Sequence, residues 1–180
     1  VLAQLLLDPY YRTLRGLATL LDKDMIAFGH KSADRNGFAQ GGVASAEWSP
    51  IWLQLLDGMR QVVRQFPSHF EYKEEALAFL ATHLYAGFVT SFRHNTPQEL
   101  QADTHAQRST SIWELLLQRY HHFRNTSFTP WPLSRGPLRP VCALQRLTVW
   151  ELYLPPKHCV AESVLADAAW CLPVPAKEGA

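Results

Sequence analysis

Cysteine, charge and long apolar runs are all scarce in this chain of 180 residues. The three cysteines, Cys142, Cys159 and Cys171, are widely spaced and odd in number, which argues against a disulfide framework and favours a reducing, cytosolic setting. No segment approaches the roughly 20 apolar residues of a transmembrane helix, and no signal-peptide pattern is present. Charged residues make up 18% of the chain and its net charge is +1, so nothing indicates a nucleic-acid partner, and an anion site requires a local basic cluster.

Hydrophobic side chains are plentiful by contrast. They account for 47% of the residues, and six tryptophans and nine phenylalanines supply enough apolar area for the core of one domain. The chain begins at Val1 inside an apolar pattern, without an initiator methionine or a polar lead-in. We therefore expect a piece of a longer protein.

The first part of the chain predicts two helices and a loop. The first helix should end near Asp8, because Pro9 lacks an amide hydrogen and restricts the residue before it. Apolar residues at helical spacing predict a second helix, or a helix plus a turn, over 10–26, because Gly16 weakens a continuous helix by about 1 kcal/mol relative to alanine. Glycines and small residues without periodicity predict a mobile surface loop over 32–47.

Two longer helices are expected next. Ser49 is predicted to cap a helix with Pro50 at its first position, and an apolar stripe carries this helix to 66. Apolar residues at three- and four-residue spacings predict the strongest helix over 74–92.

Two capping boxes mark further helix starts. Thr96 with Glu99 and Ser111 with Glu114 match the pattern in which a hydroxyl and a carboxylate satisfy opposing backbone amides. The first is expected to cap only a short turn, and the second a helix that ends around Asn125.

The remainder is expected to be irregular. Prolines and a glycine predict an extended chain over 126–140, and 144–154 fits either a strand or a short helix. The fold class is therefore mostly α, with a domain portion over 1–154 and a partly disordered tail over 155–180.

Separated blocks of unusual composition follow one another in a fixed order. They are LLDPYYRT at 6–13, Lys23-Asp24, Phe28-Gly29-His30-Lys31, SPIWLQLLD at 49–57, QFP at 65–67, FEY at 70–72, STSIW at 109–113 and LRPV at 138–141. Their order resembles the myotubularin phosphatases, and the resemblance runs from about Leu2 to Tyr153. It implies that the chain is the C-terminal helical half of an α/β cysteine-phosphatase domain.

The resemblance also implies an activity and its setting. Family members remove the 3-phosphate from phosphatidylinositol 3-phosphate or 3,5-bisphosphate, without a cofactor or metal. We expect a cytoplasmic protein that is peripheral on endosomal membranes, with a phosphoinositide head group as ligand and homo- or hetero-oligomers with relatives as possible assemblies.

The nucleophile that this chemistry needs is not found in the chain. The family attacks phosphorus with a thiolate in a Cys-x5-Arg loop from which a helix starts. Here the positions six after the three cysteines hold Thr148, Leu165 and Lys177. We expect the loop to precede Val1, and the chain to be inactive alone.

The remaining site is expected at the turn that follows Gly29. The resemblance implies that Lys31 and Arg35 contact the phosphates of the inositol ring. His30 completes this predicted substrate-binding site, and its place between a glycine turn and a lysine indicates that it orders the backbone there. Two cations on one short segment can hold a doubly charged phosphate. Composition alone favours a solvated loop, and with the resemblance added both interpretations stay open.

Several positions depart from the family pattern. Met25 and Ser32 stand where a tryptophan and an aromatic residue are usual, and 37–42 lacks the family's histidine. These departures favour an alternative, a catalytically inactive pseudophosphatase that serves as an adaptor for an active relative. The pair His121-His122 and His105 lack the neighbouring ligands of a metal site, and we expect them to be exposed.

Overall fold

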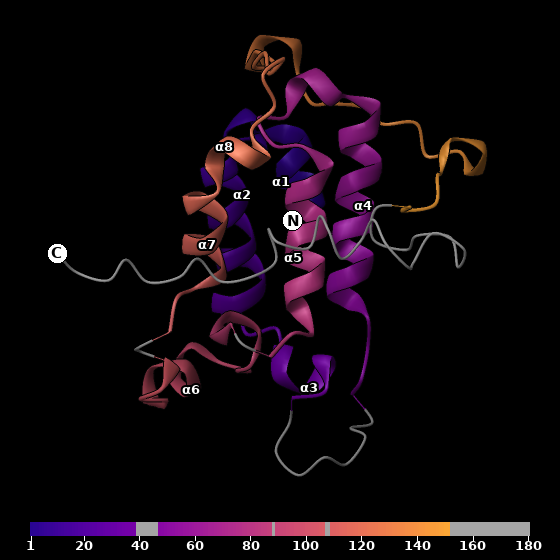
Figure 1. Ribbon diagram of the computed structural model, residues 1–180. Helices are drawn as coiled ribbons and strands as arrows, with labels where there is room; N and C mark the ends of the chain where they lie inside the picture. The colour runs from indigo at the N-terminus through magenta and orange to yellow at the C-terminus, as the bar shows by residue number, and fades with distance from the viewer. Residues whose placement is uncertain (39–46, 88, 107–108, 152–180) are drawn as a thin grey trace, which may run out of the picture.

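Helix α5 (Glu74–Leu84) runs through the middle of a helical bundle, between α4 (Ile51–Gln65) and α7 (Ile112–Gln118) (Figure 1). The computed structural model describes residues 1–38, 47–87, 89–106 and 109–151. From Ala76 to Leu84 every residue of α5 except Thr82 is buried, as expected for a helix that is apolar on all sides. Within the described ranges there is no strand, and the only sheet-like pairing is a bridge between Tyr72 and Arg124.

The N-terminal segment confirms the first predicted helix and divides the second. Helix α1 (Leu2–Leu7) ends at Asp8, whose carboxylate accepts the backbone N–H of Tyr10 at 2.8 Å. The predicted helix over 10–26 is three shorter pieces, a 3-10 helix (Pro9–Arg12), α2 (Leu14–Leu21) and a π-helix (Asp22–Ala27).

Gly16 is required where these pieces meet. A Cβ atom at this position would lie 1.9 Å from the carbonyl oxygen of Tyr10. The backbone N–H of Gly16 donates to the hydroxyl of Thr13, which caps α2. The close approach of two backbone segments therefore explains a glycine that helix propensity alone disfavours.

The predicted loop over 32–47 is wrong at its beginning. Residues Ser32–Asn36 form α3, a helix of five residues that ends at Gly37 with φ 81°. A left-handed glycine is a common helix terminus, and the indole Nε1–H of Trp52 donates to Ser32 at the other end. The later part of that loop, 39–46, lies outside the described residues.

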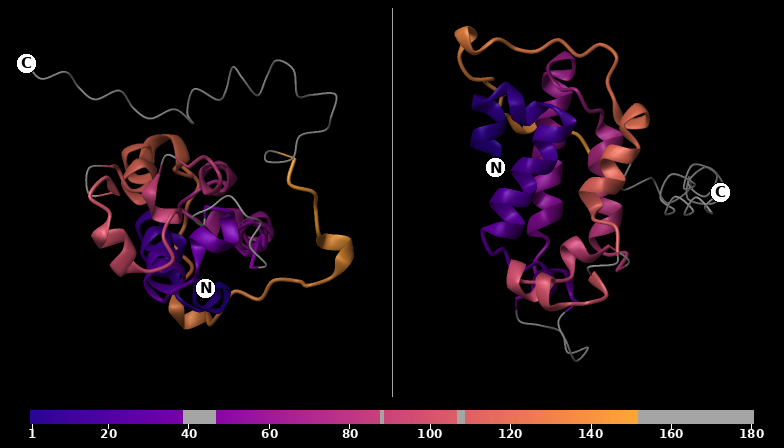
Figure 2. Two further views of the ribbon diagram at one scale, coloured as in Figure 1. Left: turned by 90° about the horizontal axis from the view of Figure 1, so that it is seen from below. Right: turned by 90° about the vertical axis from the view of Figure 1, so that its left-hand side faces the viewer.

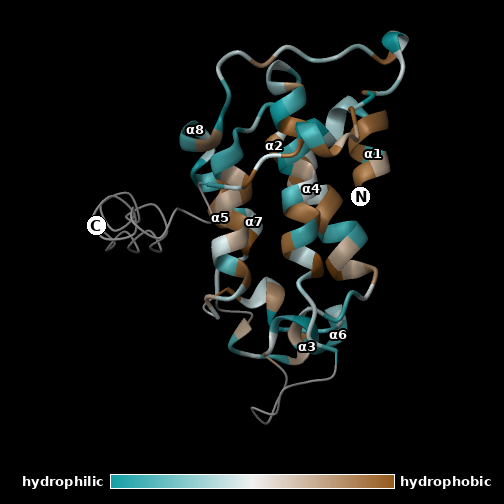
Figure 3. Cartoon of the chain, turned by 90° about the vertical axis from the view of Figure 1, so that its right-hand side faces the viewer, coloured by the Kyte–Doolittle hydropathy of each residue, from teal (hydrophilic) through white to brown (hydrophobic). Residues whose placement is uncertain are grey.

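Helix α4 confirms the next prediction except for its cap. It starts at Ile51 with Pro50 as its cap residue, and no side chain accepts a hydrogen bond there, so the predicted Ser49 cap is wrong. The helix ends before Pro67, as predicted. Figure 3 shows hydrophobic and hydrophilic positions interspersed along α4, which buries one face against α5.

The strongest predicted helix is shorter than expected. Helix α5 ends at Leu84 instead of continuing to 92, because Gly87 takes up φ 74° and turns the chain. Residues Thr90–Phe92 then form a 3-10 helix that still buries their side chains in the core. The apolar residues keep helical spacing beyond the end of α5, because α5 and the 3-10 helix pack against the same core.

Both capping boxes form at their hydroxyls. The hydroxyls of Thr96 and Ser111 accept the backbone N–H of Glu99 and Glu114. The first opens α6 (Pro97–Ala102), a helix of six residues. The second opens α7, but the expected helix to Asn125 is interrupted at Arg119 and resumes as α8 (Tyr120–Phe123).

The last described segment is held along α4 by side chains. Residues 138–150, here called the strap, have buried ends at Leu138 and Trp150 and an exposed middle. Within 144–151 the structure has a 3-10 helix (Leu144–Arg146) and then extended chain, so neither predicted form extends over the segment. The chain just before the strap crosses the end of the bundle opposite α3, and the strap itself lies alongside α4 (Figures 1 and 2). Residues 152–154 and the predicted tail lie outside the described part of the chain.

Candidate functional site

The basic pair lies at one short helix behind a glycine turn, with Lys31 as the cap residue of α3 and Arg35 within it. Gly29 has φ 90°, and the N–H of His30 donates to the carbonyl of Met25 at 2.9 Å, which closes the π-helix. The chain then enters α3, where the N–H of Arg35 donates to the carbonyl of Lys31 at 3.0 Å. Residues four apart lie on one side of a helix, so the fold brings the two predicted cations together.

Lys31 has a carboxylate partner that sequence reasoning missed. Its ammonium lies 2.9 Å from Glu47, and both side chains are about half exposed. The hydrogen bond from Lys31 to Glu47 raises the pKa of the lysine, which therefore stays charged. Because solvent screens an exposed pair, a phosphate can displace Glu47 at little cost.

Arg35 is half-buried and incompletely hydrogen-bonded. Its Nε–H is buried and has no acceptor among the described residues. Its carbonyl accepts the N–H of Ser49 at 3.2 Å, which ties α3 to the start of α4. A guanidinium N–H that is removed from water without an acceptor costs free energy, so this side chain is suited to an anion.

His30 is a neutral neighbour of the two cations. Burial, and secondly the positive charge of Arg35, lower the pKa of His30 from its ordinary value of 6.5. Its ring packs edge-on against Trp52, with 6.1 Å between centroids. Near neutral pH the site therefore contains two cations, and His30 contributes shape instead of charge.

A row of aromatic side chains supports the turn from behind. Trp52 packs against Phe92 at 5.0 Å between centroids, and Phe92 against Trp113 at 6.2 Å. Trp52 also donates to Ser32 at 3.1 Å. The unusual serine at position 32 thus has a local role, as the acceptor for a buried indole.

A polar cavity of about 510 Å³ adjoins α3 on the side of α6. Asp34 and Asn95 both line it and exchange two hydrogen bonds. No local pattern in the sequence indicates that Asn95 contacts a helix 61 residues earlier.

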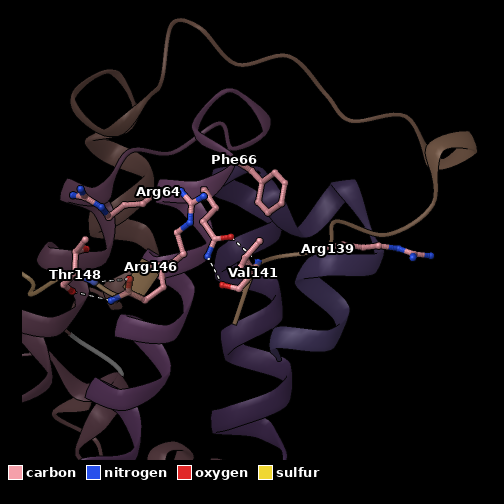
Figure 4. A pocket seen from close by; sticks show the side chains of 8 residues that line it. Arg64, Phe66, Arg139, Val141, Arg146 and Thr148 are labelled. Atoms are coloured by element: carbon pink, nitrogen blue, oxygen red, sulfur yellow. Dashed lines mark hydrogen bonds between the residues drawn. The ribbon is translucent and has the colours of Figure 1, made fainter. Parts of the chain in front are cut away.

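A second cavity of about 510 Å³ lies between the C-terminal half of α4 and the strap. Three arginines line it, Arg64, Arg139 and Arg146. Figure 4 shows that Arg139 points away from the other two. The three guanidinium groups therefore do not converge on one point.

Neither a metal site nor a membrane-spanning helix is found in the described part of the chain. Its histidine, cysteine, aspartate and glutamate residues form no group of three that could hold an ion. His105, His121 and His122 are all exposed, as predicted. None of the helices in these ranges combines the length and apolar character needed to cross a bilayer.

The chain matches the family model of the myotubularin-like phosphatase domain over residues 1–101. It is 39% identical over 155 residues to the phosphatidylinositol-3,5-bisphosphate 3-phosphatase MTMR4 of Mus musculus, a match that covers 86% of this chain and 13% of the relative. It is 34% identical over 152 residues to the phosphatidylinositol-3,5-bisphosphate 3-phosphatase MTMR2 of Bos taurus, covering 84% of this chain and 23% of the relative.

The chain thus spans less than a quarter of the length of these curated relatives. The matched region contains the glycine turn, α3 and its basic pair. Both the family model and the identity over most of the chain agree with the order of blocks along the sequence. The chain belongs to the myotubularin-like phosphatase family.

Proposed function

We propose that this chain forms the part of a phosphoinositide 3-phosphatase that recognises the lipid head group, with phosphatidylinositol 3-phosphate and 3,5-bisphosphate as substrates. The observation that carries the proposal is the basic pair, Lys31 and Arg35, held one helical turn apart on α3. The names of the relatives, phosphatidylinositol-3,5-bisphosphate 3-phosphatases, supply the substrate class.

The chemistry of the two side chains suits a ring phosphate. Arg35 offers a planar donor fork whose Nε–H has no acceptor among the described residues. The ammonium of Lys31 is a compact charge, which would leave Glu47 and donate to a phosphate oxygen instead. Together they neutralise a doubly charged group, while His30 holds the turn without adding a charge.

We propose that phosphate release depends on residues outside this chain. None of its cysteines starts a Cys-x5-Arg loop. We place that loop directly before α1, so that α1 is the end of the helix that stabilises the loop with its positive end. The helical bundle would then pack on the sheet of the complete α/β domain, and the chain alone would not release phosphate.

The double substitution Lys31→Ala, Arg35→Ala in the intact phosphatase tests the proposal. We expect KM for both lipids to rise by about tenfold or more, because charge-assisted bonds to the head group are lost. The double substitution Lys73→Ala, Arg139→Ala is the control, since it removes the same charge from a partly exposed and an exposed position outside the proposed site. Unchanged kinetics on both lipids would contradict the proposed role of the basic pair.

A second candidate function is an adaptor, a pseudophosphatase that pairs with an active relative. The departures from the family pattern at Met25, Ser32 and 37–42 favour it. Phosphate release by the intact protein, alone and mixed with an active relative, separates the two functions. For either one we propose a cytoplasmic protein on endosomal membranes, which fluorescence microscopy of the tagged protein would test.

A further inference from the structure

Asn95 and Asp34 form a reciprocal pair between two distant parts of the chain. The side-chain oxygen of Asn95 accepts the backbone N–H of Asp34 at 3.1 Å, and its amide nitrogen donates to the carboxylate of Asp34 at 3.1 Å. One amide thus binds both the main chain and the side chain of the residue that precedes Arg35.

Asn95 is itself held firmly from the side of α6. Its backbone N–H donates to the carboxylate of Glu99 at 2.8 Å, and Glu99 lies in the first turn of that helix. Thr96 caps the same helix by accepting the N–H of Glu99. Next to it, His94 bonds to the carbonyl of Thr90 and to Asp103.

Helix α3 needs this external support. With five residues it is too short to be stable by its own hydrogen bonds, so its orientation depends on what packs against it. Trp52 fixes its first residue, Ser32, and Asn95 fixes its third, Asp34. Arg35 follows directly, so a change at Asn95 reaches its guanidinium through one peptide unit.

We propose that Asn95 is a positioning residue for head-group recognition, which acts by holding α3 so that Arg35 faces the inositol phosphates. The inference rests on the proposed function of Lys31 and Arg35. It adds a residue that touches no ligand and that lies 61 positions further along the chain.

Kinetics of the intact phosphatase test the inference. Asn95→Ala should raise KM for the phosphoinositide by about tenfold, the effect of about 1.4 kcal/mol, while leaving kcat within twofold. Hydrolysis of p-nitrophenyl phosphate, which has no inositol ring to recognise, should stay unchanged. Gln98→Ala is the matched control, since Gln98 is exposed on α6 and makes no hydrogen bond within the described residues.

An exchange of the two side chains separates positioning from general stability. Asn95→Asp alone places a second carboxylate against Asp34 and should raise KM at least as much as alanine. The exchange Asp34→Asn, Asn95→Asp keeps a carboxylate that accepts the backbone N–H and an amide that donates to it, so KM should return to within twofold of the original. A folded, active exchange variant with KM still raised tenfold would overturn the inference.

A double-mutant cycle tests whether Asn95 acts through Arg35. In an Arg35→Ala background, adding Asn95→Ala should change KM by less than twofold. A full tenfold effect in that background, or an equal loss of activity on both substrates, contradicts a positioning role. If Lys31→Ala, Arg35→Ala impairs the enzyme and Asn95→Ala does not, the inference alone fails. If neither variant matters, the proposed function and the inference fail together.

Discussion

The guanidinium of Arg60 lies over the indole ring of Trp150, with 5.8 Å between its central carbon and the ring centroid. Arg60 is 1% exposed and donates to the carbonyls of Thr148 and Val149, each at 2.8 Å, and to Glu74 at 2.7 Å. One side chain of α4 therefore fastens the end of the strap and pairs with the first residue of α5.

Replacing Arg60 should release the strap. Arg60→Ala is expected to lower the free energy of unfolding by about 3 kcal/mol, because a buried ion pair loses one partner and two carbonyls lose their donor. Urea denaturation of the chain measures the change. Arg64→Ala, at a half-exposed position of the same helix, should cost less than about 1 kcal/mol. Equal losses of unfolding free energy in the two variants would contradict this role of Arg60.

Two glycines in helices should respond to alanine with opposite signs. Gly16→Ala forces a Cβ atom to within 1.9 Å of a carbonyl oxygen and should destabilise the chain by about 2 kcal/mol or more. Gly58→Ala meets only Leu2 at 3.5 Å and should stabilise α4 by up to about 1 kcal/mol. Thermal melts of both variants test the contrast. A stabilising Gly16→Ala would show that the backbones do not approach as described.

His30 should make the fold sensitive to mild acid. Because its pKa in the folded protein is below the ordinary 6.5, the unfolded state binds more protons as the pH falls below that value. The free energy of unfolding should therefore decrease from about pH 6.5 downward. Urea denaturation across this range should show a smaller decrease for His30→Gln. His105→Gln, at an exposed site, is the control, and an unchanged slope in His30→Gln would rule out this source.

The hydroxyl of Tyr120 should lose its proton at a higher pH than that of an ordinary tyrosine. Its hydroxyl donates to Glu71 at 2.8 Å, and this hydrogen bond, with burial as the second cause, raises the pKa of the phenol above 10.0. The unfolded state then loses this proton first, so stability should fall as the pH rises above about 10.

Ultraviolet titration reports the ionisation of Tyr120 directly. The spectrum of Tyr120→Phe identifies its share of the signal, and Glu71→Gln should move that share to lower pH. Glu71 also accepts the backbone N–H of Leu14, which an amide oxygen preserves, so the α2 contact should survive the substitution. Titration at the same pH in both proteins would mean that the carboxylate has no influence.

Local signals in the sequence predicted the local features of the fold. The end of α1 before Pro9 and the hydroxyl caps at Thr96 and Ser111 depend on neighbours within a few residues, and they form as expected. The predicted end of α5 is wrong, since residues 89–92 are buried and keep the apolar spacing of a continuing helix.

The candidate site was also predictable only in part. An ordered set of motifs was enough to single out Lys31 and Arg35 and to expect them on one segment. Helix α3 itself was missed, because its stability comes from Trp52 and Asn95 instead of its own small and polar residues. Such partners are visible only once the chain is folded.

The side-chain amides of Gln61 and Gln65 bind the strap backbone as a neighbouring β-strand would. Each exchanges two hydrogen bonds with the strap backbone, Gln65 with Val141 and Gln61 with Thr148 (Figure 4). The glutamines are one helical turn apart, about 6 Å, whereas their strap partners are separated by a longer stretch of chain that bulges outward. The length of the chain between Val141 and Thr148 can therefore change without a change in the hydrogen bonds at its two ends. Leu144 is exposed on that stretch, so we expect an epitope or a fluorophore tag inserted there to leave the bundle intact.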